Sequence, residues 1–389
     1  MEHPAEYYKL NRFILKLIGL WPYQSKWSAR LVRAVITIVL LSSTFFQLSS
    51  IFTSDITVDF IVDVIPALIP TFGSLSHVYA RVRHVDKLRD LFEHMWKDWR
   101  LQKTRYEMKI MREHAETTRL LTFYYLLLQY IVVIVYIIWM FMPEILDVIS
   151  PMNESRPRMQ PFKAEFFVDE EQYFYFIRSH TCLVILIMPL IFLTTSSLFV
   201  ALTQHACGMC KLLGYRAERL FCVVKSATGC DLTRSKISCG NMVVFIRLHY
   251  NIIQFIDMIQ IYHTIPFLMD LLGLVLAVSL ALTQMLTIGG DIERAFRSTG
   301  IAIVALIYLF VSNYMGQKVT DLSSSVCEKV YNSEWYNADV SEQKSLLLII
   351  KRRFNPLVLT ACRFYVMSLP KFGMILQTVI SYCMFMRQL

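Results

Sequence analysis

Charged residues are scarce in this sequence of 389 residues. They make up 18% of it, whereas hydrophobic residues make up 55%. Soluble domains have about a quarter charged residues and roughly 45–50% apolar ones. A soluble fold of this composition would have to bury nearly all of its apolar side chains. The composition therefore favours a chain that uses the lipid bilayer as a second apolar environment.

Disulfide and metal-binding patterns are lacking as well. The sequence has nine cysteines, but none falls in the long outer loop expected after the third apolar segment, so no disulfide framework is expected. Cys207 and Cys210 form one Cys-x-x-Cys pair, with no second pair or His-x-His spacing nearby. A structural zinc site takes four such ligands, so we expect neither a metal nor another cofactor.

The apolar segments also lack the features of an enzyme or a secondary transporter. Their titratable residues Asp59, Asp63, His77 and Asp270 are scattered and show no nucleophile–base spacing. A transporter would have interrupted helices at matching positions in two related halves. Only the second apolar segment is broken twice by proline, and the second half has no counterpart. Both classes are therefore disfavoured.

Seven apolar segments are expected to cross the membrane, since a spanning helix needs about 20 mostly apolar residues. Three of them qualify readily: 120–142, 181–203 and 264–288. Residues 31–52 also qualify, and 299–316 is short but nearly uncharged. Two are weaker: 56–80, which holds the prolines and three of the titratable residues, and 372–386, which is short. Polar groups and helix breaks persist inside a membrane only beside protein or water.

Basic residues predict the orientation. The first 30 residues carry five of them and no apolar core of a cleavable signal, so the first span is expected to direct insertion. With the N-terminus inside, 32 of the 39 Lys and Arg residues lie on the cytoplasmic side. The sequon at Asn153 then falls outside, as glycosylation requires. This bias explains the net charge of +9, so no nucleic-acid partner is expected.

The predicted topology places the N-terminus in the cytoplasm and the C-terminus outside. This is the reverse of a G-protein-coupled receptor, and no Asp-Arg-Tyr motif ends the third span. The cytoplasmic segments are expected to be helical, with residues 81–119 extending the third span. Before the fifth span, Val244, Leu248, Ile252, Phe255 and Ile259 form an apolar stripe at helical spacing. Such a stripe must be buried, either in the core of the chain or against another subunit.

Several phrases in order along the chain resemble the insect odorant receptor family, and those of the outer loop and after the fourth span resemble receptors of ants and bees in particular. The upstream matches are residues 162–167, 173–175, 204–208, 215–218 and His249. The C-terminal matches are residues 331–335, 346–350, Arg353, Pro356, Leu369, Phe372, Ser381 and Tyr382. The related gustatory receptors favour Thr-Tyr where this chain has Ser381-Tyr382 and end in Gln-Phe where it has Gln-Leu, so they rank second.

The resemblance implies an odorant-gated, non-selective cation channel subunit in the plasma membrane of a sensory neuron dendrite. Its partners would be a small apolar odorant, membrane lipid, cations in the pore, and a shared co-receptor with which it forms a tetramer. The implied organisation is a cytoplasmic N-terminus (1–30), a six-span bundle (31–316), cytoplasmic anchor helices (317–371) and a pore-lining last helix (372–389).

The resemblance also suggests site residues. Ligand would bind in the outer half of the bundle, between the second, third, fourth and sixth spans. The candidate pocket residues there are Ile69, Phe72, Tyr130, Ile134, Trp139, Met188, Phe192, Ala305 and Tyr308. In the last helix, one stripe of hydroxyl, aromatic and amide side chains is expected to face the pore, with the family's narrow apolar gate falling on the aromatic one. The pore candidates are Thr378, Ser381, Phe385 and Gln388.

Overall fold

A computed structural model describes most of the chain, and it is almost entirely helical. The described residues are 6–53, 55, 57–150, 156, 162, 164–169, 171–221, 236–287 and 292–386. Within these ranges the helices are α1 (Lys9–Leu17), α2 (Lys26–Thr53), α3 (Val58–Arg83), α4 (Val85–Arg100), α5 (Arg105–Met140), α6 (Met142–Ile149), α7 (Phe174–Glu218), α8 (Lys236–Thr287), α9 (Ile292–Tyr331), α10 (Val340–Lys351) and α11 (Leu369–Met386). Two short strands, β1 (Thr360–Ala361) and β2 (Tyr365–Val366), pair antiparallel between α10 and α11.

Seven of these helices correspond to the expected spans. Among the described residues, α2, α5, α7, α8 and α9 are long and apolar enough to cross a membrane. The other two are α3, which contains two prolines and the buried Asp63, and the shorter apolar helix α11. The prediction of an all-α, seven-helix architecture is confirmed. The orientation of the termini and the segment boundaries 1–30, 31–316, 317–371 and 372–389 stay predictions.

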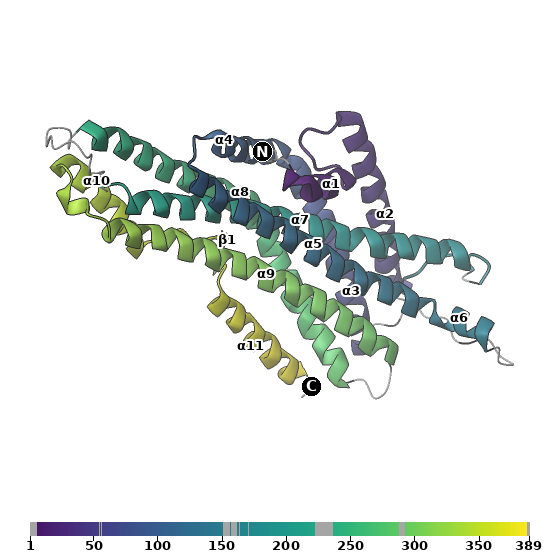
Figure 1. Ribbon diagram of the computed structural model, residues 1–389. Helices are drawn as coiled ribbons and strands as arrows, with labels where there is room; N and C mark the ends of the chain where they lie inside the picture. Colours follow the sequence, from purple (N-terminus) through teal and green to yellow (C-terminus); the bar gives the residue numbers. More distant parts are fainter. Residues whose placement is uncertain are drawn as a thin grey trace.

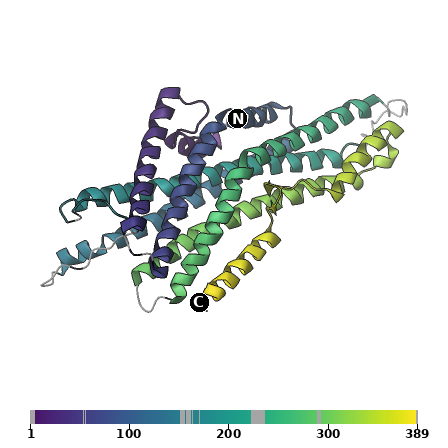
Figure 2. The same cartoon turned by 180° about the vertical axis from the view of Figure 1, so that it is seen from behind.

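The long helices give the molecule two distinct ends (Figure 1). α10 lies at one end and α6 at the other, and the same arrangement is seen from behind (Figure 2). α2 and α3 stand side by side on one flank, whereas α11 lies on the side away from α2. The last helix is therefore joined to the bundle mainly through α8 and α9.

α7 forms the centre of the bundle, where it packs on α5, α9, α8 and α3. Every residue from 193 to 210 is buried. This stretch is rich in Thr, Ser, Ala and Cys, and such small side chains allow neighbouring helices to approach closely. Their hydroxyls bond back to their own helix, as when Thr203 donates to the Phe199 carbonyl over 2.7 Å. α7 is thus the surface on which the other spans are arranged.

The segment predicted to extend the third span differs from the prediction. Residues 81–119 do not form one helix, because the chain turns between α4 and α5. α5 begins with a capping box in which the Thr104 hydroxyl accepts from the Glu107 amide and the Glu107 carboxylate accepts from the Thr104 amide. This reciprocal cap satisfies amides that a helix start leaves free. α4 is thereby released to fold against α8.

The apolar stripe before the fifth span is mostly buried inside this chain. Leu248, Ile252, Phe255 and Ile259 are core residues, whereas Val244 is 53% exposed. Phe255 packs against the rings of His94 and His205 at 5.3 Å. The stripe was expected to be buried either in the core of the chain or against another subunit. Packing within the chain accounts for four of its five residues.

The segment before α11 is held by side chains of α8 and α9. On α8, Gln260 Nε2 donates to Thr360 Oγ1 over 2.9 Å, and Thr264 Oγ1 accepts from the Cys362 amide over 2.6 Å. On α9, Asn313 Oδ1 accepts from the Tyr365 hydroxyl over 2.7 Å. The base of the last helix is therefore tied to both of these spans.

Candidate ligand cavity

A cavity of about 200 Å³ lies inside the bundle, with the space of roughly seven liquid water molecules. α3, α5, α7 and α9 build most of its wall, α8 contributes Leu274, and Phe162 comes from the loop before α7. The wall residues on these four helices are Pro66, Ala67, Pro70, Tyr125, Gln129, Val132, Val133, Tyr136, Ile185, Met188, Pro189, Phe192, Arg297, Gly300, Ile301, Val304, Ala305 and Tyr308. A mostly apolar wall with a few polar groups is typical of sites for small apolar molecules.

Proline and glycine residues explain why the helices leave space here. Pro66 and Pro70 in α3 and Pro189 in α7 lie within their helices and line the cavity. Proline has no backbone N–H, so it removes one hydrogen bond of the helix and bends it locally. On α9, Gly300 lines the cavity, and a Cβ atom added there would meet no atom within 4 Å. The hollow is thus built into three of the four helices.

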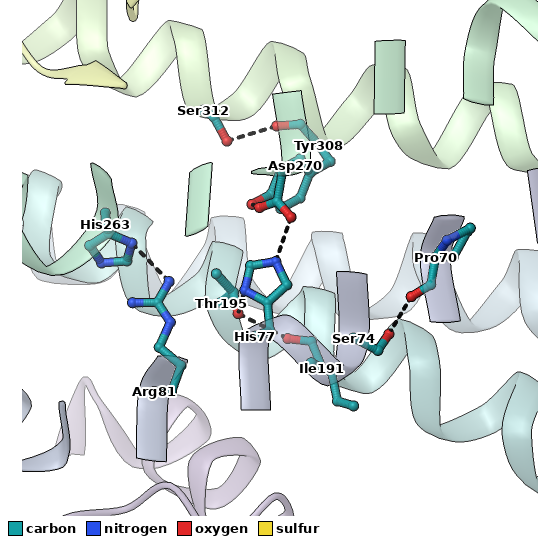
Figure 3. A network of polar contacts seen from close by, with 10 residues as sticks. All are labelled: Pro70, Ser74, His77, Arg81, Ile191, Thr195, His263, Asp270, Tyr308 and Ser312. Atoms are coloured by element: carbon teal, nitrogen blue, oxygen red, sulfur yellow. Dashed lines mark hydrogen bonds and ion pairs between the residues drawn. The ribbon is translucent and has the colours of Figure 1, made fainter. Parts of the chain in front are cut away.

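A buried polar group lies at one side of the cavity (Figure 3). His77 Nε2 on α3 is 2.6 Å from Asp270 Oδ1 on α8, and Tyr308 on α9 donates its hydroxyl to Asp270 Oδ2. Thr195 Oγ1 on α7 lies 3.4 Å from His77 Nδ1. His77 and Asp270 are each 2% exposed in their side chains. Ionisable groups buried in a membrane bundle mark functional sites by default.

The polar group touches the cavity through Tyr308 and Phe192. Both residues line the wall, and the Phe192 ring packs edge-on against Tyr308 at 5.8 Å and against His77 at 5.2 Å. A molecule in the cavity that moves either ring therefore acts on the contact between Asp270 and Tyr308, which joins α8 to α9.

A buried arginine ties α3 to α8 one turn further along. Arg81 donates to His263 Nδ1 over 3.1 Å (Figure 3), and its guanidinium lies 4.4 Å from the centre of the Tyr262 ring. Arg81 is 2% exposed. The cation–π contact and the hydrogen bonds offset part of the cost of burying its charge.

A third polar group lies at the wall of the cavity on α9. Arg297 lines the wall and donates to Asp63 Oδ1 on α3 over 2.8 Å. Gln284 on α8 donates to the same oxygen over 2.9 Å and accepts from Ser298. Because its charge is balanced by Asp63, Arg297 does not present a free cation to the cavity.

The predicted pocket residues are divided between the cavity wall and other places. Four of them line the wall: Met188, Phe192, Ala305 and Tyr308. Five do not: Ile69, Phe72, Tyr130, Ile134 and Trp139.

Each of these five residues has another environment. Phe72 and Ile134 are 49% and 52% exposed on the outside of the bundle. The Tyr130 hydroxyl donates to the Leu186 carbonyl over 3.4 Å, and Trp139 stacks on a phenylalanine of α9 at 5.0 Å. Ile69 fills the contact with α8, where its Cγ2 lies 3.0 Å from the position of a Cβ on Gly273. The expected helices thus supply the wall, but largely through other positions.

Several wall residues were not predicted from the sequence. The most informative are Tyr125 and Gln129, which lie one turn apart on α5, and Gly300. The prolines of α3 were noticed as helix breaks, and their position in a span was the available signal. Asp270 was noticed as well, but its pairing with His77, 193 residues away, has no local signature.

The described pore candidates, Thr378, Ser381 and Phe385, lie on the outward face of α11. Ile375, Val379 and Cys383 pack on the bundle, whereas Thr378 and Ser381 are exposed. Phe385 is 57% exposed. Among the predicted positions, Gln388 and the glycosylation site Asn153 lie outside the described residues.

Metal ligands do not cluster in the described part of the chain, where no group of three or more His, Cys, Asp and Glu residues is placed to hold an ion. A second hollow, of about 10 Å³, lies between α7, α8 and α9 near Cys210 and His249. It is barely large enough for one water molecule. The cavity beside Tyr308 is therefore the better candidate for a ligand site.

Comparison with curated proteins gives short matches to odorant receptors. Odorant receptor 22c of Drosophila melanogaster is 35% identical over 80 residues, which are 21% of this chain and 20% of that protein. The odorant receptor coreceptor of the same species is 23% identical over 145 residues, 37% of this chain and 30% of that protein. These matches span about a fifth to a third of the relatives' lengths.

The fold is similar along its whole length to a solved receptor structure. The insect olfactory receptor OR5 from Machilis hrabei in complex with eugenol superposes with a TM-score of 0.84 and 15% identity, covering 99% of this chain and 98% of that one. A second structure of the same receptor superposes with a TM-score of 0.77 and 14% identity. The family model described as 7tm Odorant receptor matches residues 57–380. The chain belongs to this odorant receptor family.

Proposed function

We propose that this chain is a subunit of an odorant-gated, non-selective cation channel that binds small, mostly apolar volatile molecules in the cavity beside Tyr308. The observation that carries this proposal is the apolar cavity of about 200 Å³ enclosed by four spans of a receptor fold. The similar receptor from Machilis hrabei is described in complex with eugenol, which supports a ligand site in this fold. No enzymatic role is needed to explain the cavity.

Assembly with a co-receptor into a tetramer is part of the proposal. Its support is the similarity to curated odorant receptor coreceptors. The test is to express the chain with and without a co-receptor in cells and to record currents during application of a volatile panel. We expect robust surface expression and odorant-gated current only with the co-receptor. Full odorant-gated current from the chain alone would contradict the co-receptor requirement, and silence at normal surface levels would contradict the channel itself.

The last helix is proposed to line the pore. Its support is the outward face that carries Thr378 and Ser381, whose hydroxyls bond to their own backbone over 2.9 Å, and the exposed Phe385. Polar rings and apolar constrictions are how pores select and gate.

Changing Gln388 to Glu tests the proposed pore face. A ring of added negative charge in the pore should alter cation selectivity or block by divalent ions, because it changes the field that passing ions meet. Odorant potency should stay within about twofold, since the cavity lies elsewhere in the bundle. Reversal potentials in mixed sodium and calcium solutions measure the effect. Unchanged permeation at normal surface level would place this face of α11 against lipid or protein.

The plasma membrane location and the orientation are proposed together. The 32-to-7 division of basic residues predicts a cytoplasmic N-terminus and an extracellular C-terminus. An N-terminal epitope should bind antibody only after permeabilisation, and a C-terminal epitope without it. Removal of Asn153 should abolish a glycan-dependent mobility shift. Labelling of the N-terminus on intact cells would contradict the orientation.

A further inference from the structure

The cavity wall carries two polar side chains whose hydrogen-bonding capacity is not used within the described part of the chain. Gln129 on α5 is 3% exposed, and the structure shows no hydrogen bond to its amide among the described residues. One turn earlier, the Tyr125 hydroxyl is buried and likewise has no hydrogen-bond partner there. Buried polar groups are normally satisfied. Beside a cavity, a bound molecule can supply the missing partner.

Tyr308 offers the cavity a hydrogen-bond acceptor. Its hydroxyl donates to Asp270 Oδ2, which commits its single proton. The other oxygen of Asp270 lies 2.6 Å from His77 Nε2 (Figure 3). Once its proton is committed, the phenolic oxygen retains only lone pairs. Toward the cavity, Tyr308 is therefore an acceptor.

These groups belong to one site. Tyr125, Gln129 and Tyr308 all line the same cavity. Because Gln129 follows Tyr125 by one helical turn, both project from the same face of α5. The rest of the wall is mostly apolar.

We propose that the cavity selects molecules with a hydroxyl group on an apolar skeleton, namely aliphatic alcohols or phenols. The ligand O–H donates to the oxygen of Tyr308, and the ligand oxygen accepts from the amide of Gln129, with the Tyr125 hydroxyl beside it. This inference rests on the proposed function, since it names the ligand class of that cavity.

Other ligand classes satisfy fewer of these groups. A ketone, ester or ether accepts from Gln129 but has no proton for Tyr308, and a hydrocarbon meets neither group. An ionised carboxylate has no proton for Tyr308 and must shed the water around a full charge to enter an apolar wall. A primary ammonium must shed the water around a full charge to enter an apolar wall, and both oxygens of Asp270 are already engaged by His77 and Tyr308.

The first test compares ligands of matched skeleton on the full-length chain expressed with the co-receptor. Two series serve: 1-octanol, its methyl ether, 2-octanone, octane and octylamine; and 2-phenylethanol, its methyl ether and ethylbenzene. In at least one series, the alcohol should have a half-maximal concentration about three- to tenfold below that of its ether, as expected when the hydrogen bond to Tyr308 is lost. Equal potency of alcohol and ether in both series, or a preference for the amine, would overturn the inference.

Binding to the purified chain separates this inference from the proposed channel function. The melting temperature of the protein in detergent should rise more with the alcohol than with its ether at equal concentration. If currents are absent but this difference is found, the channel proposal fails and the ligand class stands. If neither currents nor a difference in melting temperature is found, the ligand class is overturned as well.

The variant Gln129→Leu identifies the group that recognises the hydroxyl. It keeps the approximate shape of the side chain and removes the amide, so alcohol and ether potency should each fall about three- to tenfold while alkane potency stays unchanged or improves. The matched control is Tyr130→Phe, which removes a hydroxyl from the next residue on α5, outside the cavity wall, and should change none of them. Tyr308→Phe should erase the preference for alcohol over ether, because it removes the oxygen that accepts the ligand's proton. An equal shift of alcohol and alkane in Gln129→Leu would overturn the role of Gln129.

Discussion

Replacing Gly300 by phenylalanine should abolish responses to odorants that the wild-type chain detects, with at least about a hundredfold loss of potency. Gly300 lines the cavity, and its added Cβ meets no atom within 4 Å, so the ring enters the space the ligand needs. A hundredfold loss is about 2.7 kcal/mol. At about 25 cal/mol per Å², this corresponds to roughly 110 Å² of apolar ligand surface displaced from the wall.

The controls for this prediction use the same position and the same channel. Gly300→Ala adds only a methyl group to open space and should leave potency within about twofold. Current evoked by an agonist acting through the co-receptor should survive in Gly300→Phe, because assembly and the pore do not depend on the cavity being empty. Dose–response recordings with both stimuli measure the outcome. Full odorant sensitivity of Gly300→Phe would place the ligand somewhere other than this cavity.

The number and type of the spans could be predicted because length and hydropathy alone determine which segments can cross a bilayer. The rotation of each helix could not. In a soluble helix the apolar stripe marks the core, but lipid is as apolar as a protein interior, so both faces of a span look alike. Val133 lines the cavity while its neighbour Ile134 is 52% exposed. Valine and isoleucine are similarly hydrophobic, so hydropathy does not tell which of the two faces the cavity.

The contacts of the polar residues in the spans could not be predicted from the sequence either. Asp63, His77 and Asp270 looked scattered because their partners are distant in sequence. Asp63 binds Arg297, 234 residues away, and His77 binds Asp270, 193 residues away. A single sequence contains no record of such pairings. The cost of an unpaired charge in the membrane predicts only that a partner exists.

The turn between α4 and α5, by contrast, has a local signature that charge patterning obscured. Charges of both signs and near-helical apolar spacing continue from residue 81 to 119, which suggested one helix. The motif Thr104-x-x-Glu107 marks a new helix start. Local capping therefore took precedence over periodicity at this position.

The cavity and the last helix share α9 and α8, which suggests how ligand binding reaches the pore. On α9, Tyr308 lies in the cavity wall, and Asn313, five residues later, holds Tyr365 and the Ser368 amide at the base of α11. On α8, Asp270 contacts Tyr308, and Thr264 holds the chain at Cys362. We expect a ligand that shifts α9 against α8 to move both attachments of the last helix together.

Gly316→Ala tests this attachment and should reduce current at least about tenfold for odorant and co-receptor agonist alike. Gly316 on α9 faces the segment just before α11, where an added Cβ would collide with the Cβ and the backbone carbonyl oxygen of Met367. A backbone atom cannot move aside as a flexible side chain does. Met367 is 2% exposed and its amide donates to the Leu359 carbonyl over 2.9 Å. The added methyl group must therefore push the base of α11 away from α9.

Gly300→Ala is the matched control, because it makes the same change on the same helix and gains the same helix propensity, up to about 1 kcal/mol. It should leave both currents intact. Two measurements on the purified variants distinguish a displaced base of α11 from unfolding. Gly316→Ala should have a lower melting temperature than Gly300→Ala. In size-exclusion chromatography after heating, it should still elute as an assembled channel. Because Gly316→Ala leaves the cavity unchanged, the ligand-induced rise in its melting temperature should persist while its current is lost. Normal current in Gly316→Ala would show that the joint between α9 and α11 does not carry the opening motion.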